Sequence, residues 1–195
     1  MATLEFFFDF TSPYSYLAST QVETAAARAG GAVRWRPFLL GGVFKATGNH
    51  APIETVAKGR HMWIDLERWS RRLEVPFRRP QTFPVPSILA LRAVLGAPPE
   101  RLAEASRAVF RAVWAEDREI GNPAVLAAVL REVGLDGDAL VAAAPAQKEA
   151  LTSQTNEAVA RGAFGAPALF VGDELFIGND RLDFAEAALR RAAGR

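Results

Sequence analysis

The chain has 195 residues, half of them hydrophobic, which is enough to bury a core in one large domain or in a small domain with an insertion. Its formal net charge of +1 excludes the basic footprint of a protein that binds nucleic acid or an anionic membrane. It contains no cysteine, which excludes disulfides, thiolate nucleophiles and cysteine-ligated metals. His50 and His61 stand in no metal-binding spacing, so we expect no metal site.

Residues Leu4 to Phe10 predict a strand buried on both faces, because the run is apolar and aromatic rather than alternating. The run is short, carries Asp9 and follows no basic segment, so it is neither a signal peptide nor a membrane span. The expected location is therefore the cytoplasm.

A helix is predicted directly after this strand. Ser12 fits the N-cap and Pro13 the first helical position, and Gly30-Gly31 ends the helix. The residues at helical spacing are Tyr14, Leu17, Ala18, Gln21, Val22, Ala25 and Ala29. Alternation over Val33 to Pro37 then predicts a second strand, parallel to the first.

The middle of the chain, residues 41–162, is predicted to be almost wholly helical. Apolar stripes mark three helices, through Met62 to Leu73, Leu102 to Ala112 and Val125 to Val133. The third is opened by Asn122-Pro123 and closed by Gly134.

The end of the chain returns to strands. Ala168 to Val171 and Leu175 to Ile177 flank a Gly-Asp turn signal and predict a hairpin, and a last helix follows from Leu182 to Ala192. The plan is βαβ, a helical insertion, then ββα. We therefore predict an α/β thioredoxin-like fold, with residues 1–40 and 163–195 as the thioredoxin-like domain and 41–162 as the helical insertion domain.

Ser12 is the first residue that could carry chemistry. A helix N-terminus presents free backbone N–H groups that stabilise an anion, including a thiolate, and a serine hydroxyl there can donate a hydrogen bond to it. Spacing alone favours the simpler interpretation, in which Ser12 is only a cap.

Three further segments leave similar alternatives open. In a thioredoxin-like plan, Pro167 would be a cis proline facing the first helix, with Ala166 offering its backbone to an extended peptide. Asp180 in Gly178–Arg181 either caps the last helix or pairs with the ammonium group of an amino acid. Lys45 and Asn49 lie around a turn, or bind a carboxylate and a peptide backbone.

Together these segments resemble one family, the 2-hydroxychromene-2-carboxylate isomerases and the kappa-class glutathione transferases. The resemblance runs nearly end to end, and its motifs occur in the family's order. They are Phe8-Asp9-Phe10-Thr11-Ser12-Pro13-Tyr14-Ser15-Tyr16, Val43-Phe44-Lys45-Ala46-Thr47-Gly48-Asn49, Asp65-Leu66-Glu67-Arg68-Trp69, Phe164-Gly165-Ala166-Pro167 and Gly178-Asn179-Asp180-Arg181. Pro86 and His61 depart from residues common in the family, and both bear on the substrate pocket.

The resemblance implies a role for each site residue. Ser12 would hydrogen-bond the glutathione sulfur, and Asn49 would contact the tripeptide. The backbone of Ala166, beside the cis Pro167, would pair with the cysteinyl unit. Asn179 and Asp180 would hold the γ-glutamyl head, and Lys45 would face the substrate carboxylate.

The implied activity is a glutathione-dependent isomerase that interconverts 2-hydroxychromene-2-carboxylate and trans-o-hydroxybenzylidenepyruvate in the breakdown of aromatic compounds. Its expected partners are glutathione and a small aromatic substrate, and family members often form homodimers. A kappa-like transferase and a non-catalytic peptide-binding module remain as alternatives, whereas a dithiol oxidoreductase is excluded by the absence of cysteine.

Overall fold

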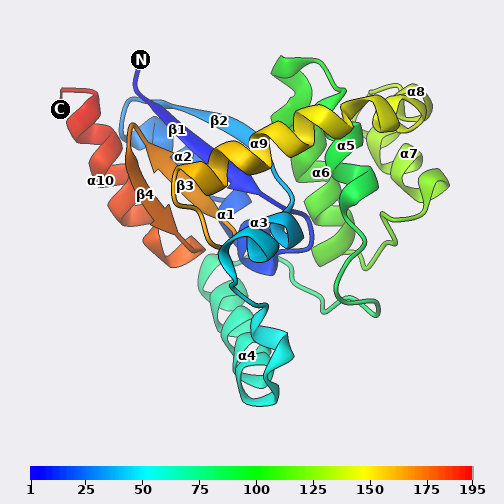
Figure 1. Ribbon diagram of the computed structural model, residues 1–195, viewed down its shortest axis with the longest axis horizontal. Coiled ribbons are helices and arrows are strands. Elements are labelled where there is room, and N and C mark those ends of the chain that lie inside the picture. Colours follow the sequence, from blue (N-terminus) through cyan, green and yellow to red (C-terminus); the bar gives the residue numbers. More distant parts are fainter. Residues whose placement is uncertain (195) are drawn as a thin grey trace.

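The two ends of the chain build one sheet. The computed structural model describes residues 1–194, with a four-stranded mixed sheet in the order β2-β1-β3-β4 (Figure 1). Its strands are β1 (Thr3–Phe8), β2 (Ala32–Pro37), β3 (Ala168–Val171) and β4 (Glu174–Ile177). β1 pairs in parallel with β2 and antiparallel with β3, and β3 pairs antiparallel with β4. The predicted thioredoxin-like plan, βαβ and ββα around a helical insertion, is confirmed.

Ten α-helices and four short 3-10 helices surround the sheet within the described residues. The α-helices are α1 (Pro13–Ser19), α2 (Val22–Arg28), α3 (Leu40–Thr47), α4 (Val56–Leu73), α5 (Ile88–Leu95), α6 (Leu102–Trp114), α7 (Pro123–Glu132), α8 (Gly137–Ala143), α9 (Lys148–Ala160) and α10 (Leu182–Ala192). The 3-10 helices are η1 (Pro52–Glu54), η2 (Pro99–Arg101), η3 (Ala144–Gln147) and η4 (Asn179–Arg181).

β1 is buried on both faces, as its apolar sequence predicts. Phe6 and Phe8 belong to the larger core, which includes residues of α1, α2 and α10. Phe7 points to the opposite face and packs edge-on against Phe38 and Phe170, in a second core that α3 and α9 cover. Helices on both faces of the sheet explain why this strand has no polar alternation.

The first helix differs from the prediction, which runs it unbroken to Ala29. It ends at Ser19, and α2 begins at Val22. The side chains of Ser19, Thr20 and Gln21 all donate hydrogen bonds to carbonyls of the preceding turn, which favours a helix break. The apolar spacing continues across the break because both helices bury residues in the same core.

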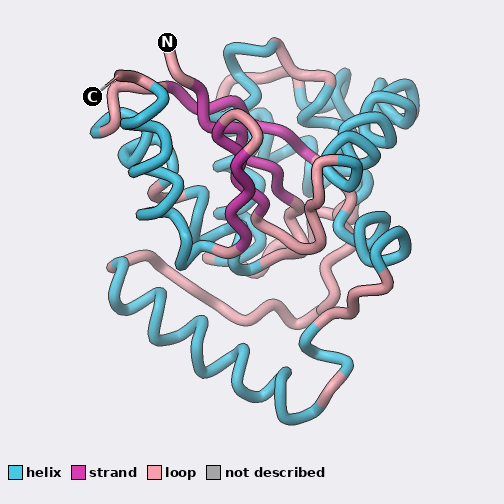
Figure 2. The backbone as a smooth tube through the Cα atoms, turned by 60° about the vertical axis from the view of Figure 1, so that its left-hand side comes forward, coloured by secondary structure: helices cyan, strands magenta, loops and turns pink. Residues whose placement is uncertain are grey.

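Most of the insertion is helical, as predicted, and the three helices inferred from apolar stripes correspond to α4, α6 and α7. α4 projects from the body (Figure 1). The longest stretch without a helix is residues 74–87, which run back beside α4 (Figure 2). They are held there by aromatic contacts, since the rings of Phe83 and Trp63 lie 5.1 Å apart and the Arg79 guanidinium stacks on Trp63.

α9 closes the insertion and packs on the sheet. Arg36 of β2 is only 6% exposed and pairs with Glu157 of α9 at 2.5 Å and with Glu5 of β1 at 2.6 Å. The Leu39 amide also donates to Thr155 Oγ1 of α9 at 2.9 Å. α9 lies within the predicted insertion, residues 41–162, but it packs on the sheet as well as on the other helices. The division of the chain into two domains at residue 162 therefore remains a prediction.

Candidate active site

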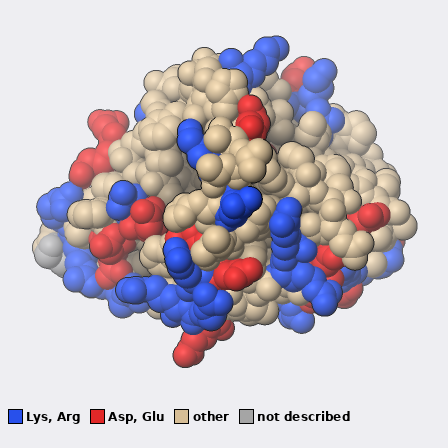
Figure 3. All heavy atoms as spheres, turned by 90° about the horizontal axis from the view of Figure 1, so that it is seen from below, with Lys and Arg blue, Asp and Glu red and all other residues tan. Residues whose placement is uncertain are grey.

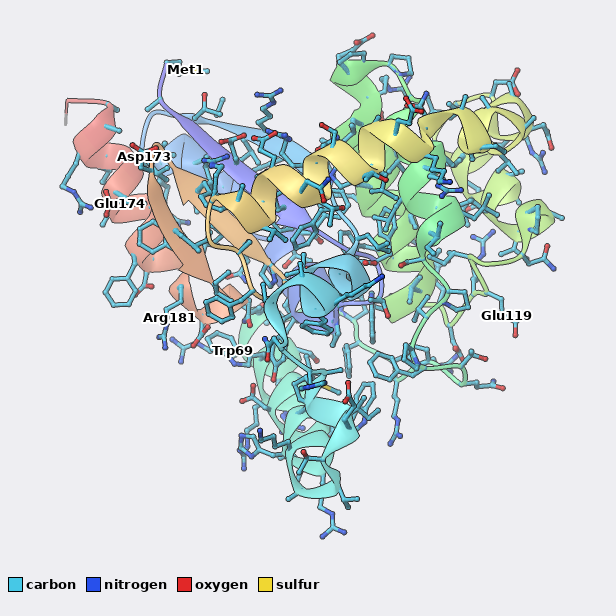
Figure 4. All side chains as sticks on the ribbon, viewed as in Figure 1. Met1, Trp69, Glu119, Asp173, Glu174 and Arg181 are labelled. Atoms are coloured by element: carbon cyan, nitrogen blue, oxygen red, sulfur yellow. The ribbon has the colours of Figure 1, made fainter. Side chains whose placement is uncertain are left out.

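Three loops meet at the end of the sheet where β1 and β4 finish and β3 begins. β1 leads into Ser12, Ala166-Pro167 precedes β3, and Gly178 with η4 follows β4. Because β3 runs antiparallel to both β1 and β4, the start of β3 lies beside the ends of the other two. In Figure 4, Arg181 of η4 accordingly lies at the opposite end of the hairpin from Asp173 and Glu174.

Ser12 is the N-cap of α1 and also faces the loop before β3. Its Oγ accepts a hydrogen bond from the Ser15 amide at 3.1 Å and donates one to the Ala166 carbonyl at 3.1 Å. The residue is only 4% exposed. The Ala166-Pro167 bond is cis, as the fold leads us to expect. The capping role and a position opposite the cis proline therefore coexist in one side chain.

A cavity of about 700 Å³ opens in front of Ser12. Its apolar walls include Phe44, Met62 and Phe83, and its polar ones include Tyr14, Asn49 and Lys58. This size and mixed lining are typical of sites for small organic molecules. Ser12, Asn49 and Ala166 are thus the predicted residues that share one cavity wall.

Asn49 links two segments far apart in the sequence. Its Nδ2 donates to the Phe164 carbonyl at 2.7 Å, which joins the end of α3 to the loop before β3. Its Oδ1 accepts from the His50 amide at 2.9 Å. Both ends of the amide are therefore engaged, and the residue holds the cavity wall together.

Asn179 and Asp180 lie in η4, which packs against α1 beside the cavity. The Asn179 side chain is buried, and its Nδ2 has no hydrogen-bond partner within residues 1–194. Asp180 is exposed and pairs with Arg181 at 3.3 Å. Gly178, just before them, lines the cavity with a φ of 101°, and a Cβ there would approach Asp180 Oδ1 to 2.5 Å. An unpartnered buried amide is uncommon, since most buried polar groups have a hydrogen-bond partner.

Lys45, which was predicted to bind the substrate, and the two departures from the family pattern, Pro86 and His61, lie outside the cavity of Ser12. Lys45 lines a separate hollow on the other side of α3, together with Arg92 and Lys148. Pro86 and His61 are exposed and do not line the cavity of Ser12. The structure therefore gives no contact between Lys45 and the cavity in which its predicted ligand would sit.

Sequence reasoning missed two polar features of the cavity. Lys58 of α4 lines the cavity and brings a positive charge to it. Tyr14 donates to Asp65 Oδ2 at 2.9 Å, which joins α1 to α4. Burial, followed by the bond to Asp65 and the charges of Asp65 and Asp180, raises the pKa of the Tyr14 hydroxyl. The motif around Asp65 belongs to the family resemblance, but the sequence does not show that Tyr14 is the partner of Asp65 and so gave Asp65 no role.

Asp9 supports the loop that carries Ser12. Its carboxyl is 1% exposed, accepts from the Thr11 amide at 3.0 Å and from the Leu40 amide at 2.8 Å, and so holds the start of α3 against the end of β1. Burial raises the pKa of Asp9, and hydrogen bonds from Ser87, Thr11 and Leu40 oppose that rise.

The charge around the projecting helix is positive. α4 carries Lys58, Arg60, Arg68, Arg71 and Arg72 against two acidic residues, Asp65 and Glu67. Figure 3 views the molecule from the side on which α4 projects, and Lys and Arg side chains gather there. Such a surface attracts anionic ligands. Within residues 1–194, no three acidic or histidine side chains cluster to hold a metal. None of the helices in that range has the length and hydrophobicity that a membrane span needs.

The fold and this site define a cysteine-free protein on a DsbA-like thioredoxin fold, and comparisons with known proteins narrow that class. Residues 3–190 match the DSBA-like thioredoxin domain family. A 2-hydroxychromene-2-carboxylate isomerase of Sphingobium xenophagum is 38% identical over 192 residues, covering 96% of this chain and 97% of that protein. Human glutathione S-transferase kappa 1 is 28% identical over 198 residues, covering 93% and 88%.

A solved structure gives the same result. The structure of a selenomethionine 2-hydroxychromene-2-carboxylate isomerase matches with a TM-score of 0.88 and 30% identity, over 98% of this chain and 96% of that one. The chain therefore belongs to the DSBA-like thioredoxin domain family and, within it, to the family of the 2-hydroxychromene-2-carboxylate isomerases.

Proposed function

We propose that the chain is a glutathione-dependent isomerase that interconverts 2-hydroxychromene-2-carboxylate and trans-o-hydroxybenzylidenepyruvate. The observation that carries the proposal is the Ser12 hydroxyl, which lies opposite the Ala166 carbonyl and the cis Pro167 at the wall of a large cavity. In a chain without cysteine, that arrangement has a place for a thiol but no thiol of its own.

The chain's own groups fit glutathione. The Asn179 Nδ2 is buried and without a partner, and the γ-glutamyl carboxylate would give it an acceptor. Asp180, close by in η4, would pair with the ammonium group of that same head. The backbone of Ala166 would pair with the cysteinyl unit, and Asn49 would support the remainder of the tripeptide from the cavity wall.

When bound, glutathione supplies a thiolate nucleophile that adds to the conjugated substrate and leaves again, so that a double bond is briefly single and can rotate. Ser12 serves this chemistry by turning its hydroxyl proton from the Ala166 carbonyl toward the sulfur. A hydrogen bond to the thiolate lowers the thiol pKa. α1 has only seven residues, so we assign this effect to the hydroxyl and the first-turn amides rather than to a long helix dipole.

The other side of the cavity suits an aromatic carboxylate. Phe44, Met62 and Phe83 would pack against the rings and exclude water. We assign the substrate carboxylate to Lys58, which lines this cavity, in place of Lys45. The raised pKa of Tyr14 keeps its hydroxyl neutral, so Tyr14 donates to Asp65 and positions α4 rather than acting as a base.

A kappa-like transferase is the second candidate, because the same thiolate site would serve conjugation and the relatives include glutathione transferases. The deciding experiment mixes the protein with the chromene and a trace of glutathione. An isomerase turns over far more substrate than the glutathione present, whereas a transferase consumes glutathione stoichiometrically and yields a conjugate.

The non-catalytic alternative is tested with the same assay. A peptide-binding module would give no turnover at any glutathione concentration, although it would still bind the tripeptide in calorimetry. The homodimeric assembly and the cytoplasmic location stay predictions, and sedimentation at micromolar concentration tests the first of them.

A further inference from the structure

A second hollow lies behind α3, on the side away from Ser12. It has a volume of about 560 Å³ and is formed by α3, α5 and the first turns of α9. Lys45 and Ala46 of α3 line it, whereas Leu40, Gly41 and Phe44 of the same helix line the cavity of Ser12. The two spaces share no lining residue, so they lie on different sides of this helix.

Positive charge converges on this hollow. Lys45, Arg92 and Lys148 line it from three different helices, and its lining includes no Asp or Glu among the described residues. None of the three cations forms an ion pair within residues 1–194, although the chain has sixteen such pairs elsewhere in that range. Unneutralised cations brought to one concave surface form an attractive site for an anion.

Arg92 gives the second, independent observation. It is half-buried, and its Nε is fully buried without a hydrogen-bond partner among residues 1–194. A buried guanidinium N–H without an acceptor costs free energy, and a turn of the side chain toward an anion in the hollow would give this N–H the acceptor that it lacks. Arginine also recognises carboxylate and phosphate groups with paired hydrogen bonds.

The rest of the lining combines an apolar part with the polar side chains of Thr152, Thr155 and Asn156. Leu39, Ile88 and Leu151 line the hollow, and Ile88 is 46% exposed, which is high for a large apolar side chain. A purely inorganic ion would leave this surface uncovered. We propose that the hollow is a binding site for a small organic dianion with an apolar body, such as an aromatic dicarboxylate, and that it is separate from the site of Ser12.

Phthalate is the probe for this site, with dimethyl phthalate as its uncharged counterpart. We expect calorimetry at low ionic strength to show saturable, submillimolar binding of phthalate, at least tenfold tighter than that of dimethyl phthalate, and weaker in added salt. Arg92→Gln and Lys148→Gln should each weaken phthalate binding about tenfold. Circular dichroism and thermal unfolding of each variant check that the fold is intact.

Lys58→Gln is the matched control, because it removes one cation from the cavity of Ser12 instead. Phthalate binding should be unchanged in this variant and in the presence of saturating glutathione. Loss of binding in Lys58→Gln with retention in Arg92→Gln would place the anion in the other cavity and overturn the proposal. The absence of saturable binding, or equal binding of dimethyl phthalate, would overturn it as well.

Discussion

The Ser12 hydroxyl and the Ala166 carbonyl lie 3.1 Å apart and are hydrogen-bonded across 154 residues of sequence. Ser12 donates this bond while the same oxygen accepts from the Ser15 amide. The carbonyl that we expect to pair with glutathione is therefore occupied by the serine that we expect to hold the sulfur. On ligand binding, the hydrogen bond between Ser12 and Ala166 would be replaced by two bonds to glutathione, one from Ser12 to the sulfur and one from the Ala166 backbone to the cysteinyl unit. Because these two bonds have different partners, the contribution of the Ser12 hydroxyl can be tested separately.

Ser12→Ala removes the donor to the thiolate and leaves the backbone in place. We expect turnover of the chromene to fall about 100- to 1,000-fold, the size of effect seen when one preorganised donor is removed. The pKa of the bound glutathione thiol should rise, which a pH titration of thiolate absorbance measures directly. Loss of the cap should also cost about 1 kcal/mol of stability.

Ser15→Ala is the control for that variant. The Ser15 Oγ is fully buried and has no hydrogen-bond partner in residues 1–194, so its removal deletes the same atom type one turn away without touching the cavity. Turnover should stay close to that of the unmodified chain. If both variants lost activity equally, the effect would come from the fold of α1 and not from a bond to sulfur.

Asn179→Ala tests the γ-glutamyl position. The Nδ2 has no partner to lose in the free protein, so thermal stability should change little, whereas glutathione should bind about 10- to 100-fold more weakly because a hydrogen bond to a charged group is lost. Calorimetric titration with glutathione gives the dissociation constant. Unchanged affinity in a folded Asn179→Ala protein would remove this residue from the binding site.

The features that sequence predicted well depend on neighbours in the chain. The apolar run of β1, the Ser12 cap and the hairpin turn are local, and each was found from a few adjacent residues. The strand pairing followed because a thioredoxin-like order leaves few ways to join these elements. The break after Ser19 was missed because three side chains bond to the previous turn, which apolar spacing does not record.

The residues of the candidate site were predicted less completely than the fold, because part of the cavity is lined by Lys58 and Met62 of α4. The bond between Tyr14 and Asp65 joins residues 51 positions apart, and no local pattern connects them. The choice between Lys45 and Lys58 depends on how α3 is rotated and where α4 projects, which tertiary packing decides. Sequence therefore pointed to Lys45 and gave no reason to consider Lys58.

Lys58→Ala and Lys45→Ala decide that question by kinetics. Lys58 lines the cavity but is exposed, so its charge is partly screened, and we expect the KM for the chromene to rise about threefold to fivefold with little change in kcat. Lys45→Ala should leave both constants unchanged. The effect of Lys58→Ala should shrink at high salt. A rise in KM in Lys45→Ala alone would restore the original prediction.

Asp9→Asn tests the buried carboxyl beneath the loop of Ser12. The asparagine keeps one acceptor, so either the Thr11 or the Leu40 amide loses its partner, at a cost of about 1–3 kcal/mol.

Burial raises the pKa of Asp9 above its usual 3.8, so the folded state favours the protonated form. The stability from that form is complete below pH 3.8 and is lost as the pH rises through the folded-state pKa. Asparagine does not titrate, so the cost of the substitution should be larger at pH 4.5 than at pH 8. Urea unfolding at both pH values measures it, and a cost that is constant or grows with pH would contradict the burial of a raised-pKa carboxyl.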